Sequence, residues 1–428
     1  MRRLNVNHLT RVEGHGAITI EVDGKKVKRV RMEIIEGPRL FETLAIGKLP
    51  SENLNLVSRI CAICTLSHRY ASIRAIEKCL GIVVPKKTFL LRELMHHGEM
   101  IESHSLHIFL LTLPDLFGYP SAPAMADKYE EYLKEGLELK KFGNKIMEVV
   151  SGRVIHGENP VIGGFGKFPT EKGLLKLSSQ AGSLIPIISH TIELLGDSEI
   201  PKYLDQETQF VCVNPPKKRY GFSGDSILIS DGKVFDAEDY KKVTNERVVD
   251  HSYAKRALYN GKPYTAGAIA RINNLDDRLS GMAAEYYRKY WNNRWKKNPI
   301  FNNTAQAIEI LYCLEKIQEL IDQIITLRNH KIIKPKKENG TGTGLVEAPR
   351  GILFHSYEIK NGRMEKSDII TPTGQNLDDI ERYMRKAAEH LLEKNKKDNE
   401  ILRQLEIIAR AYDPCISCSS HLIRVVRK

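Results

Sequence analysis

Two cysteine pairs, each in the spacing C-x-x-C, constrain this chain more than any other feature. The first pair is Cys61 and Cys64. The second is Cys415 and Cys418, so that nearly the whole of the 428-residue chain separates the two pairs. A C-x-x-C sequence at the start of a helix directs both sulfur atoms at one metal ion, and the helix N-terminus favours the thiolate form. If both pairs bind the same centre, the fold must bring the two ends of the chain together.

Four cysteine ligands are compatible with two kinds of metal site. Structural zinc modules usually keep their cysteine pairs about 15 to 20 residues apart and thereby close a small loop. Four thiolates also form a soft site that suits iron, nickel or an iron–sulfur cluster. The wide separation favours a catalytic metal centre, and structural zinc remains the alternative on spacing alone. The other three cysteines are expected to pack as small apolar residues: Cys79, Cys212 and Cys313.

The composition argues against several classes of protein. Hydrophobic residues make up 42% of the chain and charged residues 28%, as in a folded protein with a large core. No apolar run approaches the roughly 18 residues that span a bilayer, so we expect no membrane insertion. Met1 leads directly into a polar stretch, which does not resemble a secretory signal. The net charge of +12 is spread along the chain without a nucleic-acid-binding motif, so we expect no nucleic-acid partner.

The pattern of apolar residues predicts a mainly helical α+β fold. Small antiparallel sheets are expected near the N-terminus, around 205–240 and around 350–372. Asp23-Gly24 has the sequence of a type I′ hairpin turn between two N-terminal strands, and Asn361-Gly362 marks a second hairpin. The segment 331–344, which contains lysines, a proline and three glycines, is expected to be a mobile surface loop.

The same pattern predicts the helices and their order. A long helix is expected from Thr88 to Leu113, ended by Pro114. Further helices are expected over 67–80, 125–150, 171–195, 265–291, 304–329 and 377–396. We interpret residues 1–428 as a single domain with these successive parts: an N-terminal sheet region (1–50), a helical core with the first cysteine pair (51–200), a small sheet insertion (201–240), helices (241–330), a loop and hairpin (331–375), helices with the second cysteine pair (376–421) and a tail (422–428).

The residues around both cysteine pairs resemble the paired metal-binding signatures of the large subunit of nickel–iron hydrogenases. Arg59 precedes the first pair and His68 follows it. Asp413-Pro414 precedes the second pair and His421 follows it. Further segments resemble the family in the family's own order: Arg11-Val12-Glu13-Gly14-His15, Arg39-Leu40-Phe41-Glu42, Glu347-Ala348-Pro349-Arg350-Gly351 and Thr371-Pro372-Thr373. The resemblance covers essentially the whole chain and implies an oxidoreductase, the catalytic subunit of a hydrogenase.

This resemblance implies a centre of one nickel and one iron ion, in which the iron carries one carbon monoxide and two cyanide ligands. Cys61 and Cys415 would bind nickel alone, and Cys64 and Cys418 would bridge the two metals. Such a centre carries out the reversible, heterolytic cleavage of H2 to protons and electrons.

The resemblance also implies which residues act in the reaction. Cys415 would be the base that takes up the proton and passes it to Glu13. Arg350 would stand over the iron, because a guanidinium stays cationic and offers a fixed fork of donors to cyanide. Backbone groups around Pro372 and Thr373 would complete the pocket.

Further residues are expected to surround the centre. His68 would donate a hydrogen bond to a bridging sulfur atom, and Asp413 would lie next to the metal ligands. Glu42 and His421 would bind Mg²⁺ together with waters and a backbone carbonyl. Three other histidines share one helical face and are expected to be structural rather than ligands: His97, His104 and His107.

The chain has no cysteines left for a series of iron–sulfur clusters, so the resemblance implies an iron–sulfur small subunit, docked near His156. It also implies further electron-transfer subunits of the diaphorase type and a soluble acceptor such as NAD(P) or F420. Ala62 and the second motif look closest to cytosolic enzymes linked to NAD(P), coenzyme F420 or a sulfur carrier, which implies a cytoplasmic location. Nickel chaperones and a maturation protease that cuts after His421 would act on the chain, so that residues 422–428 are removed.

Two other classes of protein remain open at this point. One is a zinc-stabilised scaffold without redox chemistry. The other is a subunit like that of respiratory complex I, which derives from the same family. Those subunits have lost the four cysteines, and this chain keeps all of them.

Overall fold

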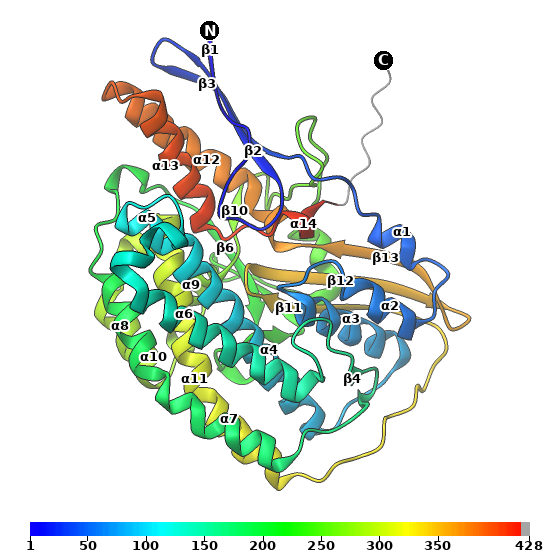
Figure 1. Ribbon diagram of the computed structural model, residues 1–428. Helices are drawn as coiled ribbons and strands as arrows, with labels where there is room; N and C mark the ends of the chain where they lie inside the picture. The colour runs from blue at the N-terminus through cyan, green and yellow to red at the C-terminus, as the bar shows by residue number, and fades with distance from the viewer. Residues whose placement is uncertain (421–428) are drawn as a thin grey trace.

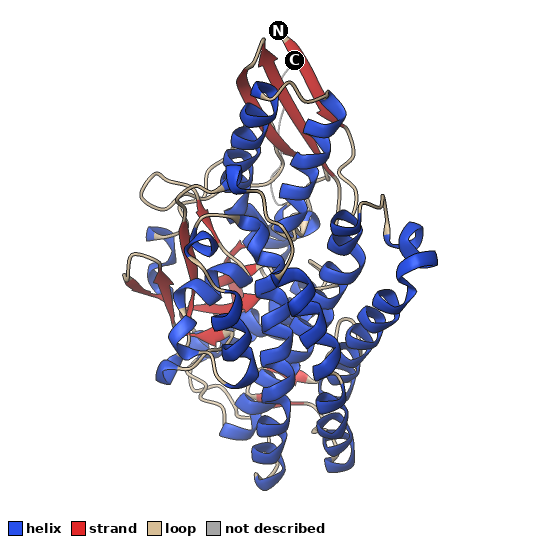
Figure 2. Cartoon of the chain, turned by 90° about the vertical axis from the view of Figure 1, so that its left-hand side faces the viewer, coloured by secondary structure: helices blue, strands red, loops and turns tan. Residues whose placement is uncertain are grey.

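The structure is a computed structural model in which residues 1–420 are described. Helices dominate it, as the apolar pattern predicts (Figure 2). The α-helices of the described chain, together with the π-helical segment η1, are α1 (Phe41–Ala45), α2 (Pro50–Val57), α3 (Thr65–Leu80), α4 (Lys86–Ser105), η1 (Leu106–Thr112), α5 (Leu113–Phe117), α6 (Ala122–Ser151), α7 (Glu171–Ser183), α8 (Ile185–Gly196), α9 (Ala268–Asn274), α10 (Gly281–Tyr290), α11 (Asn302–Thr326), α12 (Pro372–Glu393), α13 (Asp398–Ala411) and α14 (Ile416–Ser419).

Within the same residues the strands form four separate sheets. The first has the order β1-β2-β3, the second β10-β6-β8-β9, the third β13-β12-β11-β7, and β4 pairs with β5. Their bounds are β1 (Arg2–Val6), β2 (Gly16–Asp23), β3 (Lys26–Ile34), β4 (Pro160–Val161), β5 (Gly164–Phe165), β6 (Gln209–Asn214), β7 (Ser223–Gly224), β8 (Ser226–Ile229), β9 (Val234–Asp236), β10 (Tyr264–Thr265), β11 (Gly340–Ala348), β12 (Gly351–Lys360) and β13 (Arg363–Ile370).

The N-terminal sheet stands at one end of the molecule beside α12 and α13 (Figure 1). Apolar residues of the sheet and of these two helices share one hydrophobic cluster. The expected hairpin is present, but its turn is Gly24-Lys25, since Asp23 still pairs with Lys26. Only Gly24 of the two turn residues has a positive φ, +58°, so the type I′ turn that Asp-Gly predicts is wrong. A β-bulge between Glu21 and Val22 shifts the pairing register of β2 and β3 just before this turn.

The sheet that contains β11, β12 and β13 lies directly against α3 (Figure 1). Glycines that alternate along β11 face this helix, and a Cβ at Gly344 would lie only 2.1 Å from the Ala71 carbonyl oxygen. Their spacing of two is the spacing of residues on one face of a strand. The expected loop over 331–344 is therefore wrong from residue 340 onward, because these glycines belong to a strand packed closely on a helix.

The long helix expected over 88–113 begins at Lys86 but does not end at Pro114. After Ser105 the helix changes to the wider π-helical form in η1, and it then continues as α5. Pro114 lies in the first turn of α5, where a missing N–H leaves no hydrogen bond unmade. The element ends instead at Gly118, which has a φ of +78°.

Two other expected helices are interrupted. The helix over 171–195 is divided at Leu184 into α7 and α8, because Pro186 cannot continue the earlier hydrogen-bond series. The helix over 265–291 is divided into α9 and α10. The remaining predicted elements are confirmed: α3, α6, α11 and α12, and the sheets around 205–240 and 350–372.

The fold brings the second cysteine motif back to the N-terminal segment. The backbone of Glu13 pairs with that of Cys415, and Ser420 pairs with Ala254. Helix α14 consequently lies next to β2, and the helical bundle fills the other side of the molecule (Figure 1). Among the described helices, none is long and apolar enough to cross a membrane.

Candidate metal centre

Sulfur atoms from the two ends of the chain lie together in the interior. Cys61 Sγ is 3.3 Å from Cys415 Sγ, and Cys64 Sγ is 3.3 Å from Cys418 Sγ. All four sulfur atoms lie within 4.8 Å of one another, and all four cysteines are buried. The two pairs therefore form one site rather than two.

The donor set fits soft metal ions. Burial raises the pKa values of the Cys415 and Cys418 thiols well above the ordinary value of a cysteine. The reason is that a buried thiolate without a counter-ion is unfavourable. Hydrogen bonds from the neighbouring thiols, first that of Cys415, lower the pKa of Cys61. Four thiolates this close would repel one another without cations among them, and sulfur ligands select soft metals such as nickel and iron.

The N-terminus of α3 holds the first cysteine pair. The backbone N–H groups of Leu66 and Ser67 donate to the carboxylate of Glu99 over 2.7 and 2.9 Å. Burial raises the pKa of Glu99 to about 8, against the lowering effect of these hydrogen bonds. Two further backbone N–H groups point at Cys61 Sγ from 3.3 and 3.4 Å, and Cys64 is the residue that begins the helix. The helix start thus presents donors to the sulfur atoms.

The second cysteine pair is held by α12 and by the N-terminal segment. The backbone N–H of Cys415 donates to Thr373 Oγ1 over 2.8 Å. Thr373 follows Pro372, the first residue of α12, so both residues border the site. The N–H of Ile416 donates to the Glu13 carbonyl over 3.0 Å. These two bonds fix the backbone on either side of the Cys415 sulfur atom.

The Glu13 carboxylate contacts the sulfur cluster directly. Its Oε2 lies 3.2 Å from Cys415 Sγ and accepts the backbone N–H of Ser417 over 3.0 Å. Ser417 in turn donates its hydroxyl to Glu36 over 2.9 Å. Gly14 has a φ of +85°, and a Cβ there would lie 2.9 Å from the Ser417 nitrogen, so only glycine lets the two segments meet this closely.

Arg350 lies buried beside the second motif. Its Nε donates to the Asp413 carbonyl over 2.8 Å, and its Nη2 donates to the Asp413 carboxylate over 2.9 Å. Its Nη1 donates to Ser103 Oγ over 3.1 Å. Although burial alone would lower the pKa of Arg350, Asp413 and the cysteine sulfur atoms hold it well above its ordinary value. A fixed positive charge therefore faces the cluster.

His68 lies in the first turn of α3 and faces β12. Its Nδ1 is 3.0 Å from His355 Nε2, and His355 Nδ1 is 2.6 Å from the Tyr357 hydroxyl. The Tyr357 hydroxyl donates to Ser72 over 3.0 Å. A series of buried polar groups thus holds the ring of His68 in one orientation.

Of the two expected Mg²⁺ ligands, only Glu42 lies within the described residues. One Glu42 oxygen accepts a backbone N–H of β13 over 2.8 Å, and the other lies 3.7 Å from Lys255 Nζ. Burial raises the pKa of Glu42, against the lowering effect of Lys255. His421 lies outside the described residues. The carbonyl of its neighbour Ser420 accepts the N–H of Arg39, so the chain reaches the start of the helix that carries Glu42.

The remaining histidines from the sequence analysis lie in the protein core, apart from one. His104 contacts Glu309 over 2.8 Å, His107 contacts the Arg410 carbonyl over 2.7 Å, and His97 contacts the Glu93 carbonyl over 2.7 Å. His156 is only half-buried and contacts Thr65, next to Cys64, over 3.0 Å. The other three cysteines are buried, as expected of apolar residues: Cys79, Cys212 and Cys313.

Several residues at the site do not emerge from the sequence analysis, and three of them contact the cysteine motifs or Glu13. Glu99 binds the start of α3, and Ser417 and Glu36 extend the contacts of Glu13. Only Ser417 carried a usable signal, because it lies inside the second cysteine motif. The other two lie outside any motif, and long-range folding alone brings them to the site.

Comparisons with known proteins agree with this geometry. The family model described as nickel-dependent hydrogenase matches residues 39–131 and 228–421, and one described as HoxL-like matches residues 3–36. The chain is 39% identical to the alpha subunit of sulfhydrogenase 1 from Pyrococcus furiosus, over 99% of this chain and 98% of that protein. It is 33% identical to a chain of an F420-non-reducing hydrogenase from Methanocaldococcus jannaschii, over 91% of this chain and 99% of that protein.

A solved structure resembles this one over nearly all of its length. It is the crystal structure of an NAD⁺-reducing [NiFe]-hydrogenase in the H2-reduced state. The TM-score is 0.89 with 26% sequence identity, and the match covers 98% of this chain and 100% of the other. The comparisons support neither a zinc-stabilised scaffold nor a protein like the related component of complex I.

Proposed function

This chain belongs to the nickel-dependent hydrogenase family, as the catalytic large subunit of an oxidoreductase that acts on H2, and we propose that its four clustered cysteines hold the nickel–iron centre. The observation that carries the proposal is the meeting of four sulfur atoms within 4.8 Å, with a carboxylate 3.2 Å from one of them. Cys61 and Cys415 would bind nickel alone, and Cys64 and Cys418 would bind both metals. When bound, the centre takes up H2 and, over one turnover, yields two protons and two electrons.

The residues of the chain move the protons. Cys415 Sγ takes up a proton and hands it to Glu13 Oε2, the acceptor 3.2 Å away. The N–H of Ser417 holds that oxygen in place, and the Ser417 hydroxyl connects the carboxylate region to Glu36. Both glutamates are half-buried, so this series of groups leads from the buried cluster toward solvent.

Arg350 provides the fixed positive charge at the centre. Three of its five N–H groups bind Asp413 and Ser103, and the other two would donate toward diatomic ligands of the iron. Pro372 and Thr373 close the pocket from α12. His68, whose Nδ1 lies 3.0 Å from His355 Nε2, is assigned as a hydrogen-bond donor to a bridging sulfur atom.

A Mg²⁺ ion held by Glu42 and His421 is part of the same proposal. Two observations at Glu42 support this ion. The carboxylate is largely buried, which favours a counter-cation, and the chain at Ser420 binds the backbone of nearby Arg39. Lys255 already lies 3.7 Å from that carboxylate, so a Mg²⁺ ion there has to share Glu42 with an ammonium group.

Electrons leave the chain through a partner with iron–sulfur clusters. The face around His156 suits this docking, because the half-exposed ring of His156 contacts Thr65, the residue directly after Cys64. Neighbouring Ile155 is 48% exposed and offers an apolar contact. A diaphorase-type subunit would pass the electrons on in the cytoplasm. The relatives are named sulfhydrogenase, F420-non-reducing hydrogenase and NAD-reducing hydrogenase, which favours NAD(P) or a sulfur carrier over F420 as the acceptor.

The last residues of the chain are removed during maturation in this proposal. A protease cuts after His421 once nickel chaperones have loaded the metal, so that residues 422–428 are absent from active enzyme. Intact-mass measurement of active enzyme tests this step. A mass that ends at His421 supports it, and a mass that still includes Lys428 refutes it.

Metal analysis and infrared spectroscopy of the purified complex test the function itself. We expect nickel in amounts equimolar to the chain, and infrared bands of metal-bound carbon monoxide and cyanide. We also expect exchange between H2 and deuterated water. Zinc as the sole metal at the cysteines, without those bands, would contradict the proposal.

A further inference from the structure

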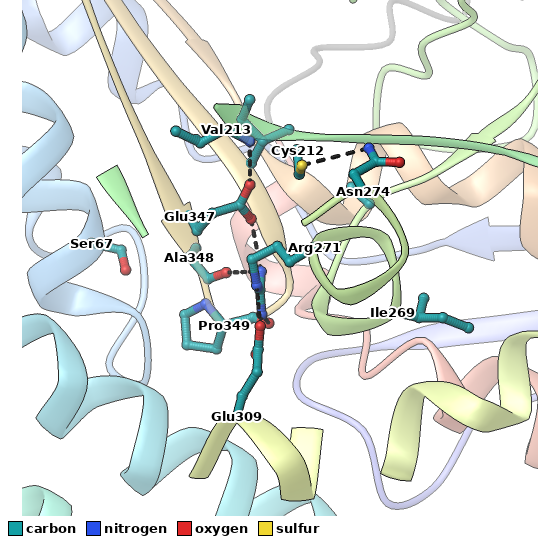
Figure 3. A network of polar contacts seen from close by, with 12 residues as sticks. Ser67, Cys212, Val213, Ile269, Arg271, Asn274, Glu309, Glu347, Ala348 and Pro349 are labelled. Carbon is teal, nitrogen blue, oxygen red and sulfur yellow. Dashed lines mark hydrogen bonds and ion pairs between the residues drawn. The ribbon is translucent and has the colours of Figure 1, made fainter. Parts of the chain in front are cut away.

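Arg271 is a buried arginine whose five N–H groups all have acceptors. It lies on α9 and its side chain is fully buried. Its Nε and Nη2 donate to the two Glu309 oxygens, each over 2.6 Å, and its Nη1 donates to Glu347 over 2.7 Å. The two remaining N–H groups donate to the carbonyls of Ala348 and Pro349, each over 3.2 Å (Figure 3). Every donor of the guanidinium is therefore used.

Three of these acceptors belong to the residues directly before Arg350. Ala348 pairs with Gly351, so Pro349 and Arg350 form the two-residue turn between β11 and β12. Gly351 has a φ of +133°, and a Cβ there would lie 2.9 Å from the backbone at the start of α9. The turn that carries Arg350 is thus bound from one side by the helix that carries Arg271.

Glu309 anchors the arrangement on α11. Burial alone would raise the pKa of Glu309, but Arg271 and His104 hold that pKa at about 2. The Glu309 carboxylate therefore stays ionised. Tyr220 also donates to this carboxylate, over 2.5 Å. The carboxylate is held by three partners and cannot swing away, so the plane of the Arg271 guanidinium is fixed. The backbone carbonyls of the turn are fixed with it.

The opposite side of the turn leads to the metal centre. The Arg350 guanidinium leaves the turn and binds Asp413, two residues before Cys415, and Ser103. A tilt of the Pro349-Arg350 peptide would displace that guanidinium, because only three side-chain bonds hold its far end. We propose that Arg271 is a positioning residue, which fixes the turn between β11 and β12 and thereby sets the orientation of Arg350 at the metal centre. This inference rests on the proposed role of Arg350.

A lysine cannot take over this task. Its ammonium group has three donors on a flexible stem, whereas Arg271 uses five donors in one plane. Arg271→Lys therefore keeps the charge and most of the volume, and loses the bonds to the two turn carbonyls. Simple loss of a buried ion pair would lower stability alone. Loss of positioning would also change the environment of the iron ligands.

Arg92→Lys is the matched control. Arg92 is likewise buried and binds a carboxylate through two N–H groups, to Glu77 over 2.7 and 2.8 Å, and its third bond goes to the Val161 carbonyl. It does not contact the turn that carries Arg350. Arg350→Lys serves as the reference for a displaced or altered donor at the iron.

The test compares these variants as purified, metal-loaded complexes. For Arg271→Lys we expect wild-type nickel content, shifted cyanide bands in the infrared spectrum, and a loss of kcat in H2–D⁺ exchange on the order of 10- to 100-fold with KM unchanged. The bands should move in the direction seen for Arg350→Lys. For Arg92→Lys we expect a lower Tm with wild-type bands and kcat.

Wild-type bands and kcat in Arg271→Lys, together with a lowered Tm, would overturn the inference, because the residue would then act on stability alone. If Arg271→Lys does not fold, Glu309→Gln carries the same test, since it removes the anchor of the guanidinium and keeps the shape of the side chain. A wild-type enzyme without carbon monoxide and cyanide bands would instead refute the proposed function. An unchanged band position in Arg350→Lys would refute the role of Arg350.

Discussion

Glu13 shares one carboxylate oxygen between the Cys415 sulfur atom and the Ser417 backbone N–H. The N–H fixes the oxygen, and the sulfur atom lies within reach for proton transfer. The other side of the residue is half-exposed, so a proton can continue outward. At the scale of single residues, we propose this carboxylate as the group through which protons pass between the buried cluster and solvent.

Glu13→Gln should separate proton transfer from assembly of the centre. A glutamine keeps an oxygen for the Ser417 N–H but cannot take up a proton, so H2–D⁺ exchange should fall about 10²- to 10⁴-fold. Nickel content and the infrared bands should stay unchanged. Glu21→Gln, a partly buried glutamate elsewhere on the N-terminal sheet, is the control and should exchange at the wild-type rate. Wild-type exchange in Glu13→Gln would rule out this route.

Glu99 predicts how stability depends on pH. Burial raises its pKa in the folded chain to about 8, above the unfolded value of about 4.3. The folded chain then binds the Glu99 proton more tightly than the unfolded chain does. The contribution of Glu99 to the free energy of unfolding is therefore full below the unfolded pKa, and it is lost as the pH rises from that value to the folded pKa. Urea unfolding at about pH 5 and about pH 8 should show a smaller decrease for Glu99→Gln than for wild type.

A control for this experiment is Glu148→Gln, an exposed carboxylate on α6 that pairs with Lys145. It should leave the pH dependence as it is in the wild type. An equal decrease in Glu99→Gln and wild type would show that Glu99 does not bind the proton.

Residue identity could be predicted where a motif frames it. Cys61, Cys415, Glu13 and Arg350 stand in short motifs whose chemistry is recognisable without a structure. Glu99 could not be predicted, because a buried carboxylate in the middle of a helix looks like a solvent-facing one in sequence. Its partner, the start of α3, lies 32 and 33 residues away in the chain.

At the scale of elements, the site depends on how closely α3 lies on the sheet of β11 and β12. The glycines of β11 leave no side chain between strand and helix, so the backbone of α3 touches the strand. The first cysteine pair begins α3, and the turn of Arg350 ends β11. A shift of this helix on this strand would therefore move one cysteine pair relative to Arg350.

Gly344→Ala should disturb that packing. The added methyl group would lie 2.1 Å from the Ala71 carbonyl oxygen and 2.5 Å from the Ala75 nitrogen, both of which are backbone atoms. We expect the free energy of unfolding to fall by about 1–3 kcal/mol or more, measured by chemical denaturation. Gly182→Ala is the control, because no atom lies within 4 Å of its added methyl group, and it should raise stability by about 0.5–1 kcal/mol.

A Gly344→Ala variant as stable as wild type would show that α3 and β11 can move apart freely. The part of the expected loop over 331–344 that is instead a strand, from residue 340 onward, has the same origin as this prediction. Glycines at every second position are as compatible with one face of a strand as with a loop. The strand is recognised only once α3 is known to pack against that face. Pro114 is a similar case, since proline is as compatible with the first turn of a new helix as with the end of an old one.

At the scale of the whole molecule, the metal centre joins segments from opposite ends of the chain. Cys61 and Cys415 are separated by 354 residues. The second motif otherwise depends on a few backbone bonds, such as those to Glu13 and Thr373. Binding to the folded form alone adds stability, so the metal should hold the C-terminal segment in place.

Removal of the metal should loosen that segment selectively. In hydrogen-exchange measurements on metal-free and loaded protein, we expect residues 411–420 to lose protection without metal, while α4 and α11 keep theirs. Apolar residues of α4 and α11 belong to one large hydrophobic cluster, which should keep these helices packed without metal. Equal loss throughout the chain would indicate that the metal supports the entire fold, and no loss would indicate that it does not bind both ends.

X-ray absorption at the nickel edge of the loaded wild-type enzyme tests the central claim most directly. The account predicts nickel surrounded by sulfur atoms with iron as a near neighbour. Cys61→Ser and Cys415→Ser each replace one sulfur ligand, from opposite ends of the chain. Each variant should lower the number of sulfur atoms around the same nickel ion. Nickel that keeps its full sulfur shell in one of these variants, or that has no iron neighbour, would contradict a shared centre built from both ends of the chain.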